Sequence, residues 1–163
     1  MSAVRELCED ERDWLAQHLA LSWGSVEIVS GGRIRDASRL PAVVCVEGER
    51  LTGLATYEVD GRDCEIVTIE AFARRWGIGS ALLGAVVAIA RERGCDRVRL
   101  ITTNDNEGAR RFYERRGFRL VAVHSGAVDR ARQIKPEIPL LGENDVEIHD
   151  DLELELRLSD GAA

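Results

Sequence analysis

The chain has 163 residues, enough for one domain that buries a sizeable core without disulfides or a metal. Its 45% hydrophobic and 31% charged residues are typical of a globular protein, and no apolar run is long enough to cross a bilayer, so we expect no membrane partner. The formal charge of −7 at pH 7 disfavours nucleic acid as a partner, because phosphate backbones attract basic surfaces.

The N-terminus and the cysteines indicate a protein of the cytoplasm. The first residues lack the basic and apolar blocks of a signal peptide, and the cytoplasm keeps thiols reduced. The cysteines are scattered without a Cys-x-x-Cys pair, so we expect small buried apolar residues and neither zinc nor redox chemistry. They are Cys8, Cys45, Cys64 and Cys95. His149 beside Asp150 and Asp151 has no further ligand nearby in the sequence, so no metal is expected.

The first half of the chain predicts a short strand, one helix and an antiparallel meander. A strand at 4–7 precedes a helix that Asp10 caps and Gly24 ends, with His18 as a core or edge residue on its apolar face. Turn signals separate the strands of the meander, which are 26–30, 42–47, 51–59 and 64–70.

The second half predicts a β-α-β unit. Residues 65–71 form a strand, residues 78–90 carry apolar side chains at helical spacing before a stop at Gly94, and residues 98–102 alternate as a second strand. A helical connection between two strands implies that they pair in parallel.

Further elements complete the layered α/β pattern of one domain, residues 1–163. They are a helix at 107–116 that ends at Gly117, a strand at 118–123 and a last strand at 151–158. The last strand alternates leucine with charged residues, and an edge position would let it pair in a homodimer. Residues 126–150 would form a long connection that carries an acidic run, namely Glu143, Asp145, Glu147 and Asp150, followed by Asp151.

A glycine turn follows the first parallel strand and opens the next helix. Gly77 and Gly79 would let the backbone N–H groups approach an anion, the helix dipole favours negative charge there, and Arg74 and Arg75 add positive charge. The alternative is an ordinary tight turn. The segment is not a Walker loop, since no Gly-Lys-Ser/Thr follows.

A second segment, residues 104–118, carries a polar strand end, a short helix with an aromatic pair, and a glycine stop. The two segments together resemble the motifs of the GNAT superfamily of acetyl-coenzyme A-dependent N-acetyltransferases. Residues 74–79 match Arg/Gln-x-x-Gly-x-Gly/Ala, and residues 106–118 match Asn-x-x-Ala-x-x-x-Tyr-x-x-x-Gly-Phe. The resemblance covers residues 65–123 and is weak after Gly126.

The resemblance implies a mixed α+β fold of three layers. A central, mostly antiparallel sheet of about six to seven strands would contain one splayed parallel pair, with helices on its faces. Acetyl-coenzyme A would lie in the splay as the acetyl donor. The residues that would bind it are Ile69, Glu70, Ala71, Arg74, Arg75, Trp76, Gly77, Ile78, Gly79, Ser80, Asn106, Ala109 and Tyr113.

The same resemblance implies direct attack of a primary amine on the thioester. Tyr113 would give a proton to the departing thiolate, the alternative being a core aromatic residue. The base would be Glu65, Glu70 or ordered water, with a solvated surface carboxylate as the alternative for either residue. Because five positions separate Glu65 from Glu70, a regular strand places them on opposite faces.

The leading hypothesis is therefore an N-acetyltransferase acting on a small amine or a peptide. Residues 126–150 would form a substrate loop or an irregular cover, and the acidic run 143–151 would attract a cationic amine if it folded over the cleft, the alternative being a solvated loop. His124, at the end of its strand, would reach the acceptor pocket or be a structural or surface residue. A non-catalytic acyl-coenzyme A-binding or sensing module is the alternative of the same fold, and Tyr113 disfavours it. A phosphate-binding domain that uses only the glycine turn is a third reading.

Overall fold

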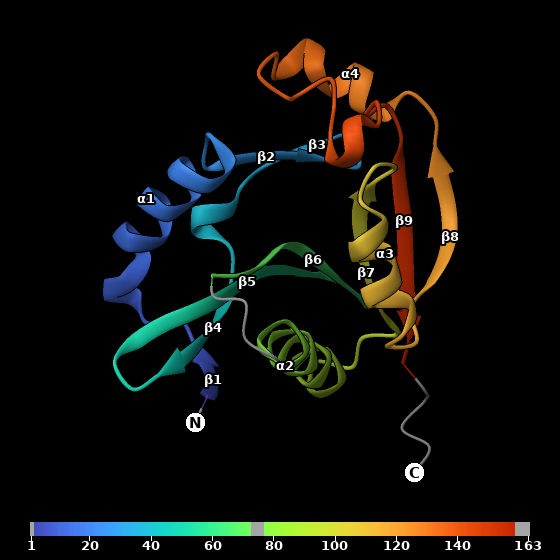
Figure 1. The fold of residues 1–163 in the computed structure, drawn as a ribbon. Helices are drawn as coiled ribbons and strands as arrows, with labels where there is room; N and C mark the ends of the chain where they lie inside the picture. The colour runs from blue at the N-terminus through green and yellow to red at the C-terminus, as the bar shows by residue number, and fades with distance from the viewer. Residues whose placement is uncertain (1, 73–76, 159–163) are drawn as a thin grey trace.

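The computed structural model describes residues 2–72 and 77–158, and Figure 1 shows their arrangement. Within these residues the main sheet has seven strands in the order β1-β4-β5-β6-β7-β9-β8. Their bounds are Ser2–Glu6 (β1), Ala42–Glu47 (β4), Arg50–Asp60 (β5), Asp63–Ala71 (β6), Arg97–Thr103 (β7), Arg119–His124 (β8) and Asp151–Arg157 (β9). A separate sheet pairs β2 (Glu27–Ser30) with β3 (Arg33–Asp36).

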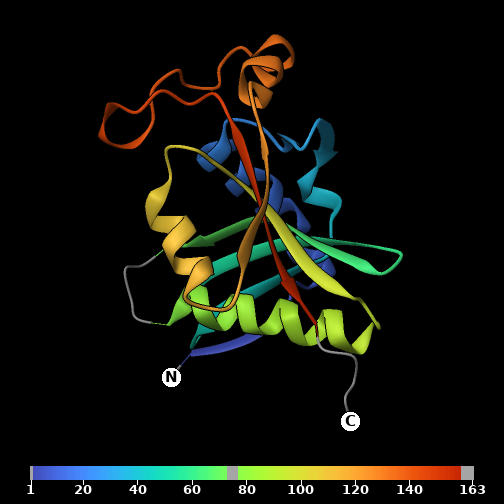
Figure 2. The ribbon, with the colours of Figure 1, turned by 90° about the vertical axis from the view of Figure 1, so that its right-hand side faces the viewer.

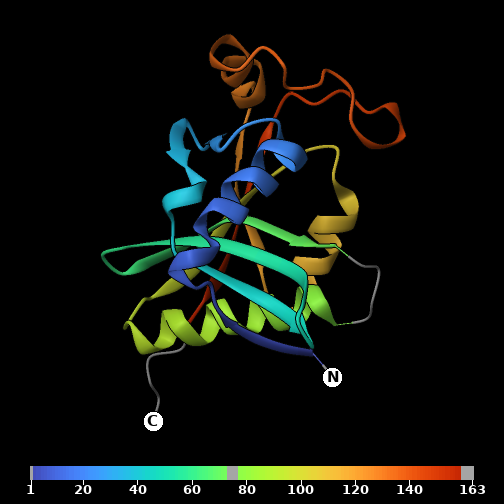
Figure 3. The ribbon, with the colours of Figure 1, turned by 90° about the vertical axis from the view of Figure 1, so that its left-hand side faces the viewer.

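Helices cover both faces of the strands β4, β5 and β6. The α-helices are Arg12–Trp23 (α1), Ile78–Glu92 (α2), Glu107–Glu114 (α3) and Ala127–Ile134 (α4), and short 3-10 helices span Glu9–Glu11, Ala37–Arg39 and Glu143–Asp145. Figure 3 shows α1 crossing the face opposite to α2. The mixed sheet between helices confirms the predicted GNAT-like fold class.

The two helices build two separate cores because each presents a stripe of residues three or four apart. On α2, Ile78, Leu82 and Val86 are at most 1% exposed and pack against one side of the sheet. On α1, Leu15 and Leu19 are fully buried against the other side. Burying each such side chain contributes about 1.5–3 kcal/mol of hydrophobic free energy. The sheet is thereby held between α1 and α2.

The parallel pair β6 and β7 separates along its length, as predicted. Residues 63–66 of β6 pair with residues 97–100 of β7, and within the described residues the pairing ends at Ile66 and Leu100. Both strands continue beyond that point, to Ala71 and Thr103. The ends of the two strands therefore border an opening in the sheet.

A β-bulge in β6 sits at the start of this opening. Tyr57 of β5 pairs with Ile66 and Thr56 pairs with Thr68, so Val67 is one extra residue in β6. A bulge shifts the alternation of side chains between the two faces. Val67 accordingly packs into the α1-side core, whereas Ile66 belongs to the α2-side core.

The bulge overturns the expectation that Glu65 and Glu70 face opposite sides. Glu70 contacts His18 of α1, and Glu65 contacts Arg35 of β3 on the same side of the sheet. Ile69, three residues after Ile66, returns to the α2-side core. Both carboxylates therefore belong to the face that α1 partly covers.

Other expectations were wrong or incomplete. β9 lies between β7 and β8, so the last strand does not offer an edge for a homodimer, and the sheet ends instead at β1 and β8. The strand expected at 26–30 is not part of the meander. It pairs instead with β3, a strand that was not predicted from the sequence. Cys8 is exposed, unlike the other cysteines.

Helix α4 and the loop after it form one end of the molecule, beyond the ends of β8 and β9 (Figure 2). The sequence predicted only a loop or cover there. Across the part of the chain that the structure describes, no helix has the length and apolarity required to cross a bilayer.

Candidate active site

The opening between β6 and β7 contains a cavity of about 160 Å³. Residues 66–69 of β6 and 100–102 of β7 form two of its walls. Trp23 at the end of α1 lies on one side of the sheet, and α3 contributes the remaining lining residues, Asn106, Ala109 and Tyr113. Four of the predicted donor-binding residues are thus brought together here, namely Ile69, Asn106, Ala109 and Tyr113.

Tyr113 is a buried phenol in this cavity. It is 7% exposed, and its ring lies 5.2 Å from Phe112 and 5.7 Å from Phe118, centroid to centroid. Burial raises the pKa of Tyr113 to about 12, because desolvation disfavours the phenolate. The hydroxyl is therefore protonated at neutral pH and is available as a proton donor.

Asn106 begins α3 as its N-cap. Its side-chain oxygen accepts a hydrogen bond from the Ala109 N–H at 3.1 Å, which satisfies one of the free donors of the first helical turn. The cap fixes the direction of α3 and so holds Tyr113, two turns further on, beside the opening. The side-chain carbonyl of Asn106 is consequently engaged within the protein.

The first turn of α2 starts at Gly77, whose φ of 90° is in the left-handed region that favours glycine. The N–H groups of Ile78, Gly79 and Ser80 belong to this first turn, where an α-helix has free donors. Arg74, Arg75 and Trp76 lie outside the described residues.

Arg116 brings positive charge to the same helix end. Its Nε donates to the Ser80 Oγ at 3.0 Å, and its guanidinium lies 3.7 Å from the centre of the Phe112 ring. A side chain at Gly79 would meet this ring, because an added Cβ would be 3.2 Å from Phe112. The close packing of α2 on α3 therefore places the Arg116 guanidinium beside the first-turn N–H groups of α2. A positive charge next to backbone N–H donors is suited to binding a phosphate.

Glu65 does not line the cavity between β6 and β7. It lies in the paired part of β6, is 6% exposed, and accepts hydrogen bonds of 2.5 Å from both Arg35 and Arg99. Its two carboxylate oxygens are thus both engaged by arginines. The structure does not bring Glu65 to the opening.

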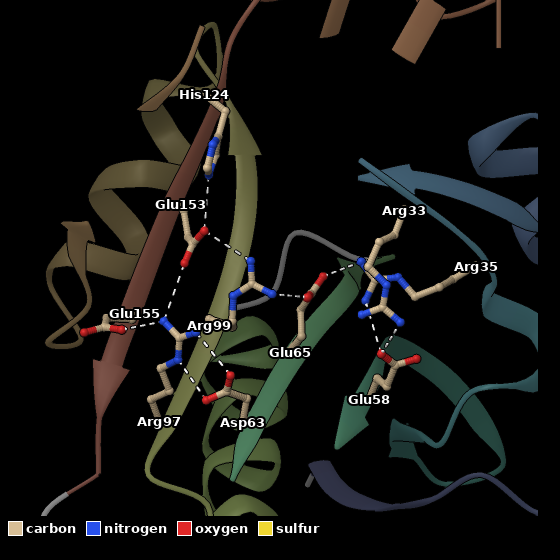
Figure 4. Close-up of polar contacts among 10 residues, drawn as sticks. All are labelled: Arg33, Arg35, Glu58, Asp63, Glu65, Arg97, Arg99, His124, Glu153 and Glu155. Carbon is tan, nitrogen blue, oxygen red and sulfur yellow. Dashed lines mark hydrogen bonds and ion pairs between the residues drawn. The ribbon is translucent and has the colours of Figure 1, made fainter. Parts of the chain in front are cut away.

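Glu65 belongs to a row of ion pairs that starts at β8, crosses the main sheet and reaches β3 of the small sheet. We call this row the charge ladder (Figure 4). His124 contacts Glu153 at 3.2 Å, and Glu153 contacts Arg99, which contacts Glu65. The remaining members are Arg33, Arg35, Glu58, Asp63, Arg97 and Glu155. Charged side chains can cover this face of the sheet without a helix above them, because partly buried charges are tolerated when they are paired.

Glu70 directly follows the cavity residue Ile69. Its Oε2 lies 2.9 Å from the His18 Nε2, and the side chains of Glu70 and His18 are 28% and 19% exposed. The His18 ring stacks on Trp14, with 5.3 Å between centroids, and lies 4.5 Å from Phe72. Glu70 is therefore held in one orientation beside the opening while it stays in contact with solvent. Ala71 follows it as the exposed last residue of β6.

Sequence reasoning did not assign His18, Trp23 and Arg116 to the site. His18 and Trp23 were expected on the apolar face of the first helix. The packing of α1 places Trp23 in the lining of the cavity and His18 against Glu70. Among the described residues, no group of three or more His, Cys, Asp or Glu side chains is arranged to hold a metal ion.

Comparisons with known proteins agree with this geometry. The profile of the Acetyltransferase (GNAT) family matches residues 5–118. The uncharacterised protein YdhI of Bacillus subtilis strain 168 is 40% identical over 141 residues, which are 86% of this chain and 86% of that protein.

Solved structures match the fold over nearly the whole chain. An IAA acetyltransferase from Bacillus cereus ATCC 14579 has a TM-score of 0.75 at 19% identity, over 97% of this chain and 100% of that one. A Bacillus subtilis acetyltransferase in complex with CoA has a TM-score of 0.67 at 18% identity, over 96% and 97% of the two chains.

Proposed function

The chain belongs to the GNAT acetyltransferase family, and we propose that it moves an acetyl group from acetyl-coenzyme A to a primary amine by direct attack. The observation that carries this proposal is the cavity between the splayed strands, with the protonated phenol of Tyr113 in its lining. Residues 1–163 act as one catalytic domain in this proposal.

The donor fits the residues around the opening. Beyond Ile66, the edge of β6 that faces β7 makes no strand pairing with the described residues. An extended pantetheine arm would bind there through the backbone of Ile69, Glu70 and Ala71. The first turn of α2, from Gly77 to Ser80, would bind the diphosphate. Arg116 adds charge there, and Arg74, Arg75 and Trp76 are proposed to contribute from the adjoining segment.

The thioester supplies an activated acetyl group, and the protein moves the protons. The ammonium form of the acceptor loses a proton to Glu70, directly or through water, and the neutral nitrogen attacks the carbonyl carbon. A backbone N–H near Ile69 or Glu70 would stabilise the oxyanion. When the carbon–sulfur bond breaks, Tyr113 gives its proton to the thiolate, which leaves as the free thiol of coenzyme A. The nitrogen, which became cationic on attack, loses its second proton through water to the Tyr113 phenolate, so the product is the neutral amide and the phenol is restored.

Glu70 is the proposed base because it follows Ile69 and because, among the described residues, its carboxylate has one side-chain partner, His18. Glu65 is not proposed, because Arg35 and Arg99 hold both of its oxygens. His18 positions Glu70 through the 2.9 Å contact.

The first test combines binding with turnover. Titration calorimetry with acetyl-coenzyme A should give saturable heat, and a panel of primary amines should include substrates that release free thiol. Tyr113→Phe should lower kcat by about 100-fold, within the range for loss of a general acid, while the dissociation constant for acetyl-coenzyme A stays unchanged. Phenylalanine keeps the ring that packs against Phe112 and Phe118, so the variant removes the hydroxyl without opening a cavity in the core.

Two results would contradict the proposal. Equal thiol release by wild type and Tyr113→Phe would remove Tyr113 as the acid. Binding of acetyl-coenzyme A without turnover of any amine would favour the acyl-coenzyme A-binding module instead.

A further inference from the structure

Two larger cavities lie on the α1 side of the sheet. One, of about 520 Å³, lies between the end of α1, β2 and α4 and is called the inner pocket. The other, of about 420 Å³, lies between the β2–β3 turn, β9 and α4 and is called the outer pocket. Val29, Ala131 and Asp151 line both pockets, so the two adjoin.

The inner pocket also adjoins the cavity between β6 and β7. Trp23 lines both spaces, and Thr102 in the lining of the cavity is followed by Thr103 in the lining of the pocket. An acceptor in the inner pocket would therefore have one end close to the opening where the donor is proposed to react.

The walls of the inner pocket are mostly apolar. They include Trp23, Ile28, Val128, Ala131, Ile138 and Pro139. Its charged lining residues are Lys135, Glu137 and Asp151. The Lys135 Nζ donates to the backbone oxygens of Trp23 and Glu27 at 3.2 and 3.3 Å, and Glu137 is exposed.

Asp151 is the buried charge of both pockets. It is 7% exposed and begins β9, where it pairs with Thr103 of β7 on one side and His124 of β8 on the other. The Gly31 N–H in the β2–β3 turn donates to its carboxylate. Burial raises the pKa of Asp151, and the neighbouring Asp150 carboxylate adds to the rise, whereas the Gly31 hydrogen bond and the nearby side chains of His124 and Arg130 oppose it. The carboxylate is thus incompletely compensated, and a bound cation would stabilise it.

We propose that these pockets bind the acceptor and that Asp151 binds a second cationic group of it, remote from the attacking nitrogen. This inference rests on the proposed function and names its substrate class, a primary amine joined to a second ammonium group by a short apolar spacer. Asp151 is an acceptor-binding residue in this scheme and does not take the reacting proton.

The position of Asp151 favours the remote group over the attacking nitrogen. Residues 100–102 of β7 line the reaction cavity, whereas Asp151 pairs with Thr103, the next residue, and lies one strand further from β6. Neighbouring strands are about 4.8 Å apart, so a spacer of several methylene groups is needed to bridge this offset. The apolar walls of the inner pocket suit such a spacer.

Wild-type enzyme alone tests the charge preference with three acceptors of equal chain length. They are cadaverine, pentylamine and δ-aminovalerate, whose remote ends are cationic, apolar and anionic. We expect kcat/KM, measured by thiol release, to decrease in that order. A preference for δ-aminovalerate would overturn the proposal and assign the pockets to an anionic acceptor through Arg99, Arg130 and His124.

The variant Asp151→Asn then tests whether the charge of Asp151 binds the remote ammonium group. Asparagine keeps an oxygen for the Gly31 N–H but removes the charge, so the ratio of kcat/KM for cadaverine to that for pentylamine should fall by about 10- to 100-fold, as expected for a lost charged hydrogen bond. The fall should appear in KM for cadaverine. Asp150→Asn is the matched control, because Asp150 binds the Gly126 N–H at 2.9 Å and lines neither pocket. This control should leave the ratio unchanged.

The remaining outcomes are also decisive. A loss that is equal for both amines would give Asp151 a structural or proton-transfer role and overturn the inference. Turnover of peptides or other amines, but of none of the three pentyl acceptors, would overturn the inference and leave the proposed function intact. Absence of acetyl-coenzyme A binding would instead remove the proposed function itself.

Discussion

Glu65 and Glu70 share one strand and one face, and their partners give them different roles. Two arginines hold Glu65 in the charge ladder, whereas Glu70 contacts one histidine and remains 28% exposed. A base must exchange protons with the acceptor or with water, and a carboxylate whose oxygens both bind guanidinium groups is poorly placed to do so. The comparison predicts opposite phenotypes for the two Glu→Gln variants.

Glu70→Gln should lower kcat/KM for the amine by about 100-fold near neutral pH, because the glutamine cannot accept the proton. The defect should shrink as pH rises, since a larger share of the amine is then already neutral. A pH profile of kcat/KM for both enzymes measures this. A defect of the same size at every pH would show that Glu70 positions the acceptor and takes no proton from it.

Glu65→Gln should act on stability instead. Removing one partner of a buried ion pair leaves charge uncompensated, so the free energy of unfolding should fall by about 3 kcal/mol. Urea unfolding measures the loss, and thiol release by the folded fraction should stay within about twofold of wild type. If Glu65→Gln had a normal unfolding midpoint and a large loss of kcat, Glu65 would have to take part in the reaction, as a general base.

At the scale of elements, the splay depends on how three segments end or begin. The bulge at Val67 turns β6, the cap at Asn106 directs α3, and Gly77 begins α2 with a left-handed residue. The cap and the glycine follow from residue types that are typical of those positions. The bulge has no such marker, which is why the two glutamates were assigned to opposite faces.

Gly77→Ala tests the helix start. An added Cβ meets no described residue within 4 Å, so the expected cost is conformational, about 1 kcal/mol for a left-handed alanine. We expect a lower unfolding midpoint and a higher KM for acetyl-coenzyme A, because the first-turn N–H groups change direction. Gly84→Ala is the control within α2, since that exposed helical glycine also has free space around it and alanine favours the helix. An unchanged KM for acetyl-coenzyme A in Gly77→Ala would show that the first turn of α2 does not bind the donor.

Long-range pairing limited what the sequence could predict about the remaining elements. The alternating leucines of β9 correctly predicted a strand with one core face, yet alternation does not specify its neighbours. Its insertion between β7 and β8 places Asp151 beside both Thr103 and His124. The acceptor pockets arise from that insertion and from α4, so no local motif indicated them.

At the scale of the whole molecule, arginine–carboxylate pairs should set the stability in acid. The Arg5 guanidinium lowers the pKa of Glu11 to about 2, and hydrogen bonds from Arg97 and Arg62 lower the pKa values of Asp63 and Asp96. A carboxyl group whose pKa is lower in the folded state stabilises the fold above its unfolded pKa and loses that contribution as pH falls through the folded pKa. The urea midpoint should therefore decrease steadily below about pH 5.

Arg5→Gln isolates one such pair. Without the guanidinium, the pKa of Glu11 moves toward its ordinary value, so the variant should be less stable than wild type at neutral pH. The difference should shrink as pH falls and be almost lost near pH 2, where Glu11 is protonated in the variant and about half protonated in wild type. Arg111→Gln is the control, because its contact with Glu107 is 3.7 Å long and exposed. A pH-independent difference between Arg5→Gln and wild type would attribute the effect to packing of the arginine stem, since only a titrating partner makes the difference depend on pH.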